Sequence, residues 1–388
     1  MAIASSDRIK MRRGTSAESS WGETPSSPAC TDFRVTSANA NSGKTTVQST
    51  EIRPDRMVSD IIQTGFSASG DFGTELSYAS HDWAMESLFG STFDTNTITG
   101  AGSTQNFRFE PSPYNALYGP GLEAFQVGQW VTIASASNSA NNGRFRITGK
   151  NTNYLVFDST QATFVSEDSS SASITGTTLV MGTSEISYFM EQEFNDITQF
   201  KYMTGLRISQ MDLNVTSRSV ITAAFNWMAK DLTRAASTTG GASAAANSNR
   251  IIDASTGVGT VEEADATLST ALRSISCTVN GNLRALDKIG ASALAEINDG
   301  TFNVTGTVEA YFEDAGLYTK ALDHTATSLN WRATDAAGNM YIFGLPKVYL
   351  TGDPNAAGQN QDILLPLAFE AAIDADSSTM MRIDKLAA

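Results

Sequence analysis

The clearest pattern in the chain is the alternation of apolar and polar residues from Gly65 to Tyr78. Apolar side chains take one set of alternate positions: Phe66, Ala68, Phe72, Leu76 and Tyr78. Small or acidic side chains take the other set, with Ser67, Ser69, Asp71, Glu75 and Ser77. Successive side chains of a strand point to opposite faces. The pattern therefore predicts a strand with one buried face and one wet face.

A short helix is expected directly after this strand. Asp82 is placed to cap it, and the next residues form an apolar stripe of Trp83, Met85, Leu88 and Phe89. Gly90 stands where such a helix would stop. The same order of strand and helix returns later, in a strand at 301–312 and a helix-like stretch at 317–322. This likeness of pattern favours an internal duplication.

Further short apolar runs, separated by Ser, Thr, Asn and Gly, predict a protein made mainly of strands. A strand is expected at 185–190, and a hairpin at 205–216 and 219–228. Residues 97–176 read as a compact insert with strands at 128–133, 144–148 and 153–157. The fold class is therefore mainly β, a sandwich or barrel with short helices and an inserted small all-β domain. The expected domains are 1–96, which includes an N-terminal arm, the insert 97–176, and 177–388.

Several segments are expected to lie outside the regular structure. Residues 1–35 are polar and read as an extended arm, and residues 37–50 are small and polar. Pro54 excludes a central strand from the charged segment that follows. The Ala/Ser/Thr/Gly-rich residues 235–249 are expected to form a flexible loop.

Composition narrows the class of function. The chain has 388 residues, 41% of them hydrophobic, which is ordinary for a folded protein with a core. The formal net charge of −15 argues against a surface that grips nucleic acid, since phosphate binding needs clustered Lys and Arg. It is compatible with a surface that DNA slides past, because a wall of like charge repels phosphate.

The cysteines and the N-terminus point to a soluble protein made in a reducing cytoplasm. Cys30 and Cys277 are far apart and are expected to be buried or idle thiols. The first residues lack the apolar core of a signal peptide, and no run approaches the ~18 apolar residues of a membrane helix.

Residues that could carry chemistry are few. Gly43-Lys44-Thr45 looks like the end of a phosphate-binding loop, but Ala38 occupies the place of its leading glycine, so a flexible loop is expected. His81 and His324 have no Cys or carboxylate at metal-ligand spacing and are expected at the surface or at a helix cap. Asp374 and Asp376 fit a solvated turn. We predict no catalytic residues, no metal, no cofactor and no enzyme activity.

Several motifs, taken in order, resemble the phage tail tube proteins. In the first half they are Thr50 to Arg56, Gly65 to Phe72, Glu75 to Tyr78, Asp82 to Gly90, Ser187 to Glu193 and Tyr202 to Ile208. In the second half they are Ser276 to Leu283, Asp299 to Gly306 and Gly338 to Pro346. The resemblance covers most of the chain outside the insert. Small β modules of this kind decorate the outside of some tail tubes.

The resemblance implies a structural virion protein of a long, non-contractile tail, a siphovirus major tail protein. Its subunits would form stacked hexameric rings around a channel for DNA ejection. The implied partners are further copies of the chain, the tape measure protein, the tail terminator and the tail tip proteins. DNA would pass through the lumen without specific binding. The protein would be assembled in the host cytoplasm, with no membrane contact.

Two groups of residues are candidates for this function. The polar faces of the predicted strands are expected to line the lumen, through Asp71, Glu75, Asp212, Asn214, Asn303 and Glu309. The charged segment with Glu51, Arg53, Asp55 and Arg56 resembles the loop that reaches a neighbouring subunit or ring. For both groups the alternative is simple exposure to solvent.

Two other functions stay open. A capsid decoration or tail-terminator protein could be built from similar β modules. A host-glycan-binding tail protein could act through the insert, where Tyr114, Tyr118 and Trp130 are candidate exposed aromatic side chains.

Overall fold

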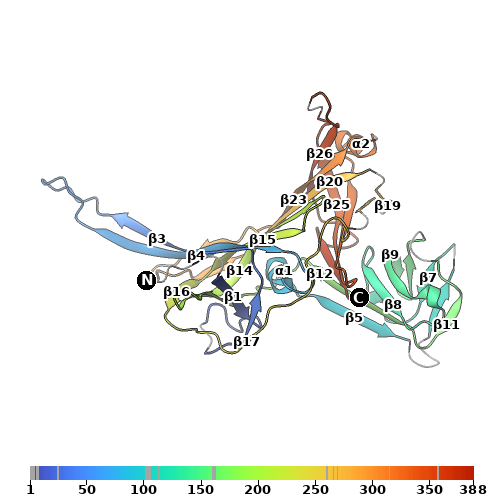
Figure 1. The fold of residues 1–388 in the computed structure, drawn as a ribbon, viewed down its shortest axis with the longest axis horizontal. Coiled ribbons are helices and arrows are strands. Elements are labelled where there is room, and N and C mark those ends of the chain that lie inside the picture. The colour runs from blue at the N-terminus through green and yellow to red at the C-terminus, as the bar shows by residue number, and fades with distance from the viewer. Residues whose placement is uncertain are drawn as a thin grey trace.

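The structure is a computed structural model, and it describes residues 5, 8–23, 26–100, 106–111, 113–159, 163–258, 261–264, 266–268, 270–313, 315–355 and 358–388. Within these residues the chain is mainly β, with one large connected set of strands, a separate two-stranded sheet and two α-helices. The predicted fold class is therefore confirmed. A long arm leaves the body at one end, and the insert lies at the other (Figure 1).

The first elements are β1 (Ile9–Gly14), β2 (Cys30–Phe33), β3 (Ser37–Gln48), β4 (Ile61–Glu75), α1 (Asp82–Phe89) and β5 (Asp94–Thr99). The insert contains β6 (Phe107–Glu110), β7 (Ala116–Tyr118), η3 (Leu122–Ala124), β8 (Trp130–Ala134), η4 (Ser139–Asn141), β9 (Gly143–Asn151), β10 (Tyr154–Phe157), β11 (Glu167–Ser169) and β12 (Ser173–Val180). Next come β13 (Tyr188–Phe194), β14 (Gln199–Thr216), β15 (Thr222–Ala229), β16 (Asp231–Ala235), β17 (Ser243–Ala244), β18 (Val261–Glu263), β19 (Ala266–Thr267) and β20 (Leu272–Asn280). The last elements are β21 (Arg284–Leu286), β22 (Glu296–Asn298), β23 (Asn303–Tyr311), α2 (Gly316–Leu322), β24 (Thr327–Thr334), β25 (Met340–Thr351), β26 (Leu364–Ala371) and β27 (Arg382–Leu386).

Eight strands form a central antiparallel sheet in the order β3–β4–β15–β14–β20–β23–β26–β25. One face of this sheet is the core, where one row of opposed residues is fully buried: Phe72, Phe225, Met211, Val279 and Val304. Side chains alternate along each strand, so the same strands turn polar residues to the other face. The predicted alternation at 65–78 and the predicted hairpin β14–β15 are both confirmed.

Two strands of the central sheet, β14 and β25, continue beyond it into a second layer. There β14 pairs with β13 and β16, and β25 pairs with β24 and β27. A single apolar cluster runs beneath the sheet from Met11 to Ile383 and joins both halves of the chain. The two halves therefore share one core.

Helix α1 lies against the apolar face of the sheet. Trp83 stacks on Phe72 with ring centroids 5.7 Å apart. The helix stops at Gly90 as predicted, because this residue is left-handed (φ 61°) and its N–H donates to the carbonyl of Glu86. The N-cap is His81 and not Asp82, which is the first helical residue.

The two histidines differ in environment. His81 occupies the helix cap, one of the two predicted places, but it is buried there, 1% exposed, with Nε2 3.0 Å from the carbonyl oxygen of Arg34. Burial lowers the pKa of His81 to about 4. His324 is exposed, as predicted, and its ring stacks on Tyr349 at 4.5 Å.

The insert has an apolar cluster of its own, built around Phe109, Phe145, Phe157 and Phe164. It joins the body through the ribbon of β5 and β12, which pair from 94 to 99 and from 173 to 178. The expected boundaries, 97 and 176, lie inside these two strands. Trp130, expected to be exposed, is buried against Ile342 and Leu386 where the insert meets the body.

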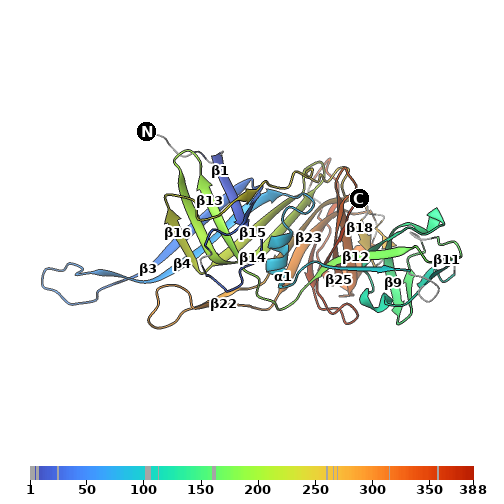
Figure 2. The ribbon, with the colours of Figure 1, turned by 90° about the horizontal axis from the view of Figure 1, so that it is seen from below.

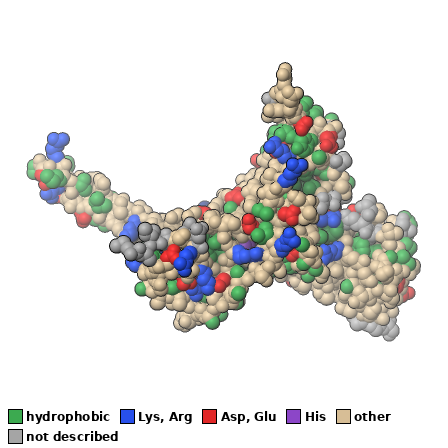
Figure 3. Space-filling view, in the orientation of Figure 1, with side chains coloured by type: hydrophobic (Ala, Val, Ile, Leu, Met, Phe, Trp, Pro, Cys, Tyr) green, Lys and Arg blue, Asp and Glu red, His purple; other side chains and the backbone are tan. Residues whose placement is uncertain are grey.

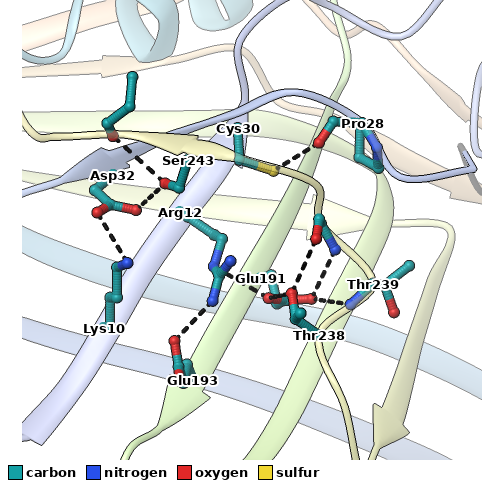
Figure 4. Close-up of polar contacts among 12 residues, drawn as sticks. Lys10, Arg12, Pro28, Cys30, Asp32, Glu191, Glu193, Thr238, Thr239 and Ser243 are labelled. Atoms are coloured by element: carbon teal, nitrogen blue, oxygen red, sulfur yellow. Dashed lines mark hydrogen bonds and ion pairs between the residues drawn. The ribbon is translucent and has the colours of Figure 1, made fainter.

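Two segments expected to be irregular are part of the sheet system. Within residues 1–35, β1 pairs with β13 and with β2, so this region is not an extended arm. Residues 235–249, expected to form a flexible loop, pack against the body. Within them β17 pairs with β2. In Figure 4 the buried Glu191 carboxylate accepts hydrogen bonds from Thr238 Oγ1 (2.9 Å) and Thr239 N (2.8 Å), and Arg12 Nε lies 3.1 Å from it. A buried carboxylate needs such partners, which explains why this small-residue segment is ordered.

The region 37–50, expected to be irregular, is mostly strand β3. It pairs with β4 from Ser37 opposite Gly73 to Gln48 opposite Ile61. The expected loop at Gly43-Lys44-Thr45 is therefore wrong, since these residues lie within the hairpin. Past the body, β3 and β4 continue as a two-stranded arm (Figure 1), whose tip is residues 49–60.

Candidate functional site

The first candidate site is the polar face of the central sheet. The strand register aligns its residues in rows. One row is Asn39, Asp71, Asn226, Gln210, Asn280 and Asn303. The next is Ser37, Gly73, Ala224, Asp212, Thr278, Thr305 and Glu370. Then come Glu75, Thr222, Asn214, Ser276, Thr307 and Ala368, and finally Thr216, Ser274, Glu309 and Pro366. All six residues expected to line a lumen therefore lie on one face of one sheet.

Short polar contacts hold the carboxylates of this face in place. The amide of Asn39 donates to Asp71 at 3.1 and 3.2 Å. Thr278 Oγ1 donates to Asp212 at 2.7 Å, and Gln210 Nε2 donates to the same carboxylate at 2.8 and 3.0 Å. These bonds run along or across strands, so they fix the acidic side chains against the sheet.

The face is acidic and amide-rich. None of the positions aligned in the four rows is Lys or Arg. Arg273 stands at the end of the face, where its guanidinium lies 3.4 Å from Glu309. Apart from that end, the four rows present carboxylates, amides and hydroxyls, with the small or apolar residues Gly73, Ala224, Ala368 and Pro366 between them. On β25, Tyr349 continues the second row opposite Glu370, and Lys347 Nζ lies 5.8 Å from its ring centroid.

The second candidate site is the tip of the arm. Glu51, Arg53, Asp55 and Arg56 all lie in the exposed turn that joins β3 to β4. Arg53 binds Asp55 in a bidentate pair, Nε–Oδ1 at 3.1 Å and Nη2–Oδ2 at 2.8 Å. The hydrogen bond from Arg53 lowers the pKa of Asp55, and the same bond raises the pKa of Arg53. Both side chains are exposed, so the pair shapes the turn and adds little stability.

The arm also carries apolar side chains that the sequence reasoning missed. Six large ones are exposed on it: Val47, Ile52, Met57, Val58, Ile61 and Ile62. Ile52 is 98% exposed. Figure 3 shows hydrophobic side chains along the arm and basic ones at its tip. A second, shorter hairpin, β21–β22, carries the exposed Leu286 and Ile289 and projects from the same end of the body (Figure 2). Clusters of this kind usually mark a surface that another chain covers.

The signal for these residues was present in the sequence. Apolar side chains flank Pro54 in a charged segment that has no helical or strand periodicity of its own. Such side chains have no core to enter, and this combination points to a contact with another molecule.

Metal-binding side chains do not gather in the described part of the chain. No cluster of three or more His, Cys, Asp or Glu there could hold a metal ion. Cys30 and Cys277 are free and buried, as predicted, and burial raises the pKa of Cys277 to about 12. Asp374 closes a turn by accepting hydrogen bonds from Ser377 N and Oγ at 2.9 and 2.8 Å. Among the helices of these residues, none has the length and hydropathy needed to cross a bilayer.

Residues 11–371 match the family model of phage tail tube proteins, a span that includes both candidate surfaces and the insert. A search of the curated proteins found no match. Membership of this family makes the chain a structural component of the virion tail, and it implies that copies of the chain assemble with one another. The match takes in nearly the whole chain, and we conclude that it belongs to the family of phage tail tube proteins.

Proposed function

We propose that copies of this chain form hexameric rings around a bore, and that the rings stack into the tail tube through which DNA is ejected. The observation that carries this proposal is the continuous polar face of the central sheet. Seven of its strands contribute to the four rows, and no Lys or Arg interrupts them. In this arrangement the polar face lines the bore and the apolar face forms the subunit core.

The lining works by electrostatic repulsion. Asp71, Glu75, Asp212 and Glu309 keep the wall negative, and Asn214 and Asn303 add polar groups without positive charge. Phosphates bind to surfaces through Lys and Arg, and the four rows have neither. DNA therefore passes this face without specific binding. Before ejection the same bore holds the tape measure protein.

The arm provides the contact between rings or between neighbouring subunits. Burial of an exposed Ile or Met side chain stabilises an interface by about 1.5–3 kcal/mol. Ile52 and Met57 stand next to the charged residues Glu51, Arg53, Asp55 and Arg56, which would then make ion pairs with a neighbour.

The remaining assignments follow from this arrangement. The insert 97–176 projects from the outside of the tube, and 1–96 and 177–388 build the tube itself. The ends of a non-contractile, siphovirus-type tail bind the terminator and tip proteins, and assembly takes place in the host cytoplasm. The protein acts through its surfaces, as a structural protein with no enzyme activity.

Negative-stain electron microscopy of the purified chain at rising concentration, with light scattering, tests the proposal. We expect rings or long tubes with a stain-filled bore, and outer protrusions that disappear when the insert is deleted. A compact oligomer of fixed size at every concentration, and no tubes when the chain is co-produced with the other tail proteins, would overturn it. That result would instead favour a decoration or terminator protein.

A further inference from the structure

A cavity of about 550 Å³ lies at the seam between the insert and the body. The insert lines it with Val127 and Gly128, from the segment before β8, and with Arg146 from β9. The body lines it with residues of β24, β25, α2 and β27 and with the turn at 374–377. Both parts of the molecule enclose this space, so a molecule bound in it would touch both.

The guanidinium of Arg382 reaches from the body into this seam. Arg382 is buried, 5% exposed. Its Nε lies 3.2 Å from Oδ2 of Asp384, and its Nη1 donates to the carbonyl oxygen of Val127 at 3.1 Å. Its Nη2 has no partner among the described residues. One charged donor therefore remains free at the cavity.

Two glycines leave space beside this donor. A Cβ on Gly128 would stand 2.9 Å from Nη2 of Arg382, and a Cβ on Gly344 would stand 3.9 Å from it. The Cβ on Gly344 would also stand 2.8 Å from Oδ1 of Asn330, which lies opposite Gly344 in the β24–β25 register. A larger side chain at either glycine would therefore occupy the part of the cavity next to the guanidinium.

Two further donors line the cavity. Asn330 is 5% exposed, and its amide Nδ2 has no hydrogen-bond partner in the described part of the chain. A buried amide without a partner costs free energy, which an acceptor bound in the cavity would recover. Lys347 forms no ion pair with any described carboxylate, and its ammonium lies 5.8 Å from the ring centroid of Tyr349.

The carboxylates that line the cavity do not use these donors. Asp374 accepts hydrogen bonds from Ser377 N and Oγ at 2.9 and 2.8 Å, within its own turn. Asp376 is exposed to solvent. The remaining lining cation, Lys320, is paired with Glu263. The unmet hydrogen-bonding capacity at the cavity is therefore that of Arg382, Asn330 and Lys347, and it suits an acceptor with negative charge.

We propose that this cavity binds a small oxyanion, a phosphate or a carboxylate, which bridges the insert and the body. Arg382 and Asn330 donate hydrogen bonds to it, and Lys347 adds a positive charge. Hydrogen bonds between a guanidinium and an oxyanion are charge-assisted and stronger than neutral ones. The bound anion also packs against the Val127–Gly128 segment and so fixes the insert on the body. All of these groups belong to one chain, so the inference does not depend on ring formation.

Isothermal titration calorimetry of the purified chain with citrate tests the proposal. Inorganic phosphate is the second probe, and chloride at equal ionic strength is the control. We expect saturable binding of citrate at a single site, and slower hydrogen exchange of residues 126–129 in the bound form. Anions such as phosphate also stabilise folded proteins by exclusion from their surface, so the readouts are the heat of binding and local exchange rather than the melting temperature.

Four variants show whether the binding takes place in this cavity. Lys347→Gln should weaken citrate binding about tenfold, because a charged donor is lost. Lys288→Gln removes the same charge from the exposed loop between β21 and β22, and this matched control should leave the affinity unchanged. Asp376→Asn removes a negative charge near the anion and should tighten binding about threefold. Asn330→Asp places a carboxylate near Nη2 of Arg382 and should abolish binding, because it repels the anion and takes its donor.

Two results would overturn the proposal. The first is the absence of saturable binding of either probe to the wild type. The second is equal affinity of the wild type, Lys347→Gln and Asn330→Asp for citrate, because the anion would then bind elsewhere. The melting temperature of each variant without citrate shows whether it is folded. Lys347 is only half-buried and has no ion pair in the described chain, so its variant is expected to fold as the wild type does.

Discussion

The body consists of two repeats of one arrangement, which share a core and differ in two connections. The first repeat is β3, β4, α1, β13, β14, β15 and β16, and the second is β20, β23, α2, β24, β25, β26 and β27. In the first repeat, β3 and β4 are joined by the long arm; in the second, the matching β20 and β23 are joined by the short β21–β22 hairpin. Between α1 and β13 the first repeat holds the insert, whereas four residues, 323–326, separate α2 from β24. The shared part buries one core and presents one polar face. The two larger outward parts, the arm and the insert, belong to the first repeat, and the second repeat projects the shorter β21–β22 hairpin. Tube building and external contact are therefore carried by different segments of the chain.

The largest expected effect compares the helix anchors of the repeats. Trp83→Ala should lower the free energy of unfolding by about 4 kcal/mol, and Leu317→Ala by about 3 kcal/mol, because both leave a cavity in the shared core. Trp83 also packs against Phe33, Phe72 and Tyr188, which explains the larger loss. Urea unfolding measures both. Leu322→Ala, at an exposed position of α2, is the control and should change stability by less than about 0.5 kcal/mol.

The N-cap position distinguishes the repeats in their response to pH, since it is His81 in the first and Ala315 in the second. Burial lowers the folded-state pKa of His81 from 6.5 to about 4, so the unfolded chain binds more protons between these values. Neutral His81 therefore contributes to the free energy of unfolding above pH 6.5. This contribution is lost as the pH falls towards 4, and the total loss is roughly 3 kcal/mol. Unfolding of the wild type and of His81→Gln across this range should show a shallower slope for the variant. Equal slopes would contradict the assignment.

The projecting hairpins should differ in their effect on assembly. Ile52→Ser with Met57→Ser on the arm should raise the concentration needed for tube growth at least about tenfold, because two exposed apolar side chains lose their burial. Ile289→Ser on the short hairpin should have a smaller effect. Sedimentation of tubes measures both. An unchanged melting temperature of the unassembled variants shows that folding is intact, and unchanged tube growth would remove the arm from the interface.

The smallest expected effect concerns the polar face. Asp71→Lys with Glu75→Lys in the first repeat should leave tubes intact and slow DNA ejection a few-fold, because the Lys side chains bind phosphate as the DNA passes. Glu309→Lys in the second repeat should do less, since Arg273 already stands beside that position. Ejection kinetics of particles carrying each variant decide the matter, with Asp71→Asn and Glu75→Gln as the neutral control. Unchanged kinetics in the Lys variants would argue against a lumen at this face.

The sequence predicted the elements whose side chains alternate strongly. The strand that contains Phe72, the hairpin at β14–β15 and the stop at Gly90 follow from local periodicity and backbone chemistry. β3 could not be predicted in this way, because Asn39, Asn41 and Gly43 have low strand propensity and owe their conformation to pairing with β4. The path of 235–249 depends on Glu191, a distant residue, and burial of Trp130 depends on the docking of the insert.

For the candidate site, the sequence showed which alternate positions of each strand are polar, but it did not show which strands lie side by side. Asp71, Asp212 and Glu309 come from parts of the chain that are far apart, and only the register shows them on one face. The sequence reasoning chose the charged residues at the arm tip and passed over Ile52 and Met57. The apolar residues around Pro54 in a charged segment were a usable signal, whereas the degree of their exposure is a property of the fold.

Strand β12 has a mechanical consequence. It is one continuous strand whose first residues pair with β8 of the insert and whose last residues pair with β27 of the body. A pull on the insert along this strand therefore loads the hydrogen bonds of the ladder together, in shear, and no flexible tether takes up the strain. A load applied at the outer end of the insert is thereby transmitted to the wall of the body.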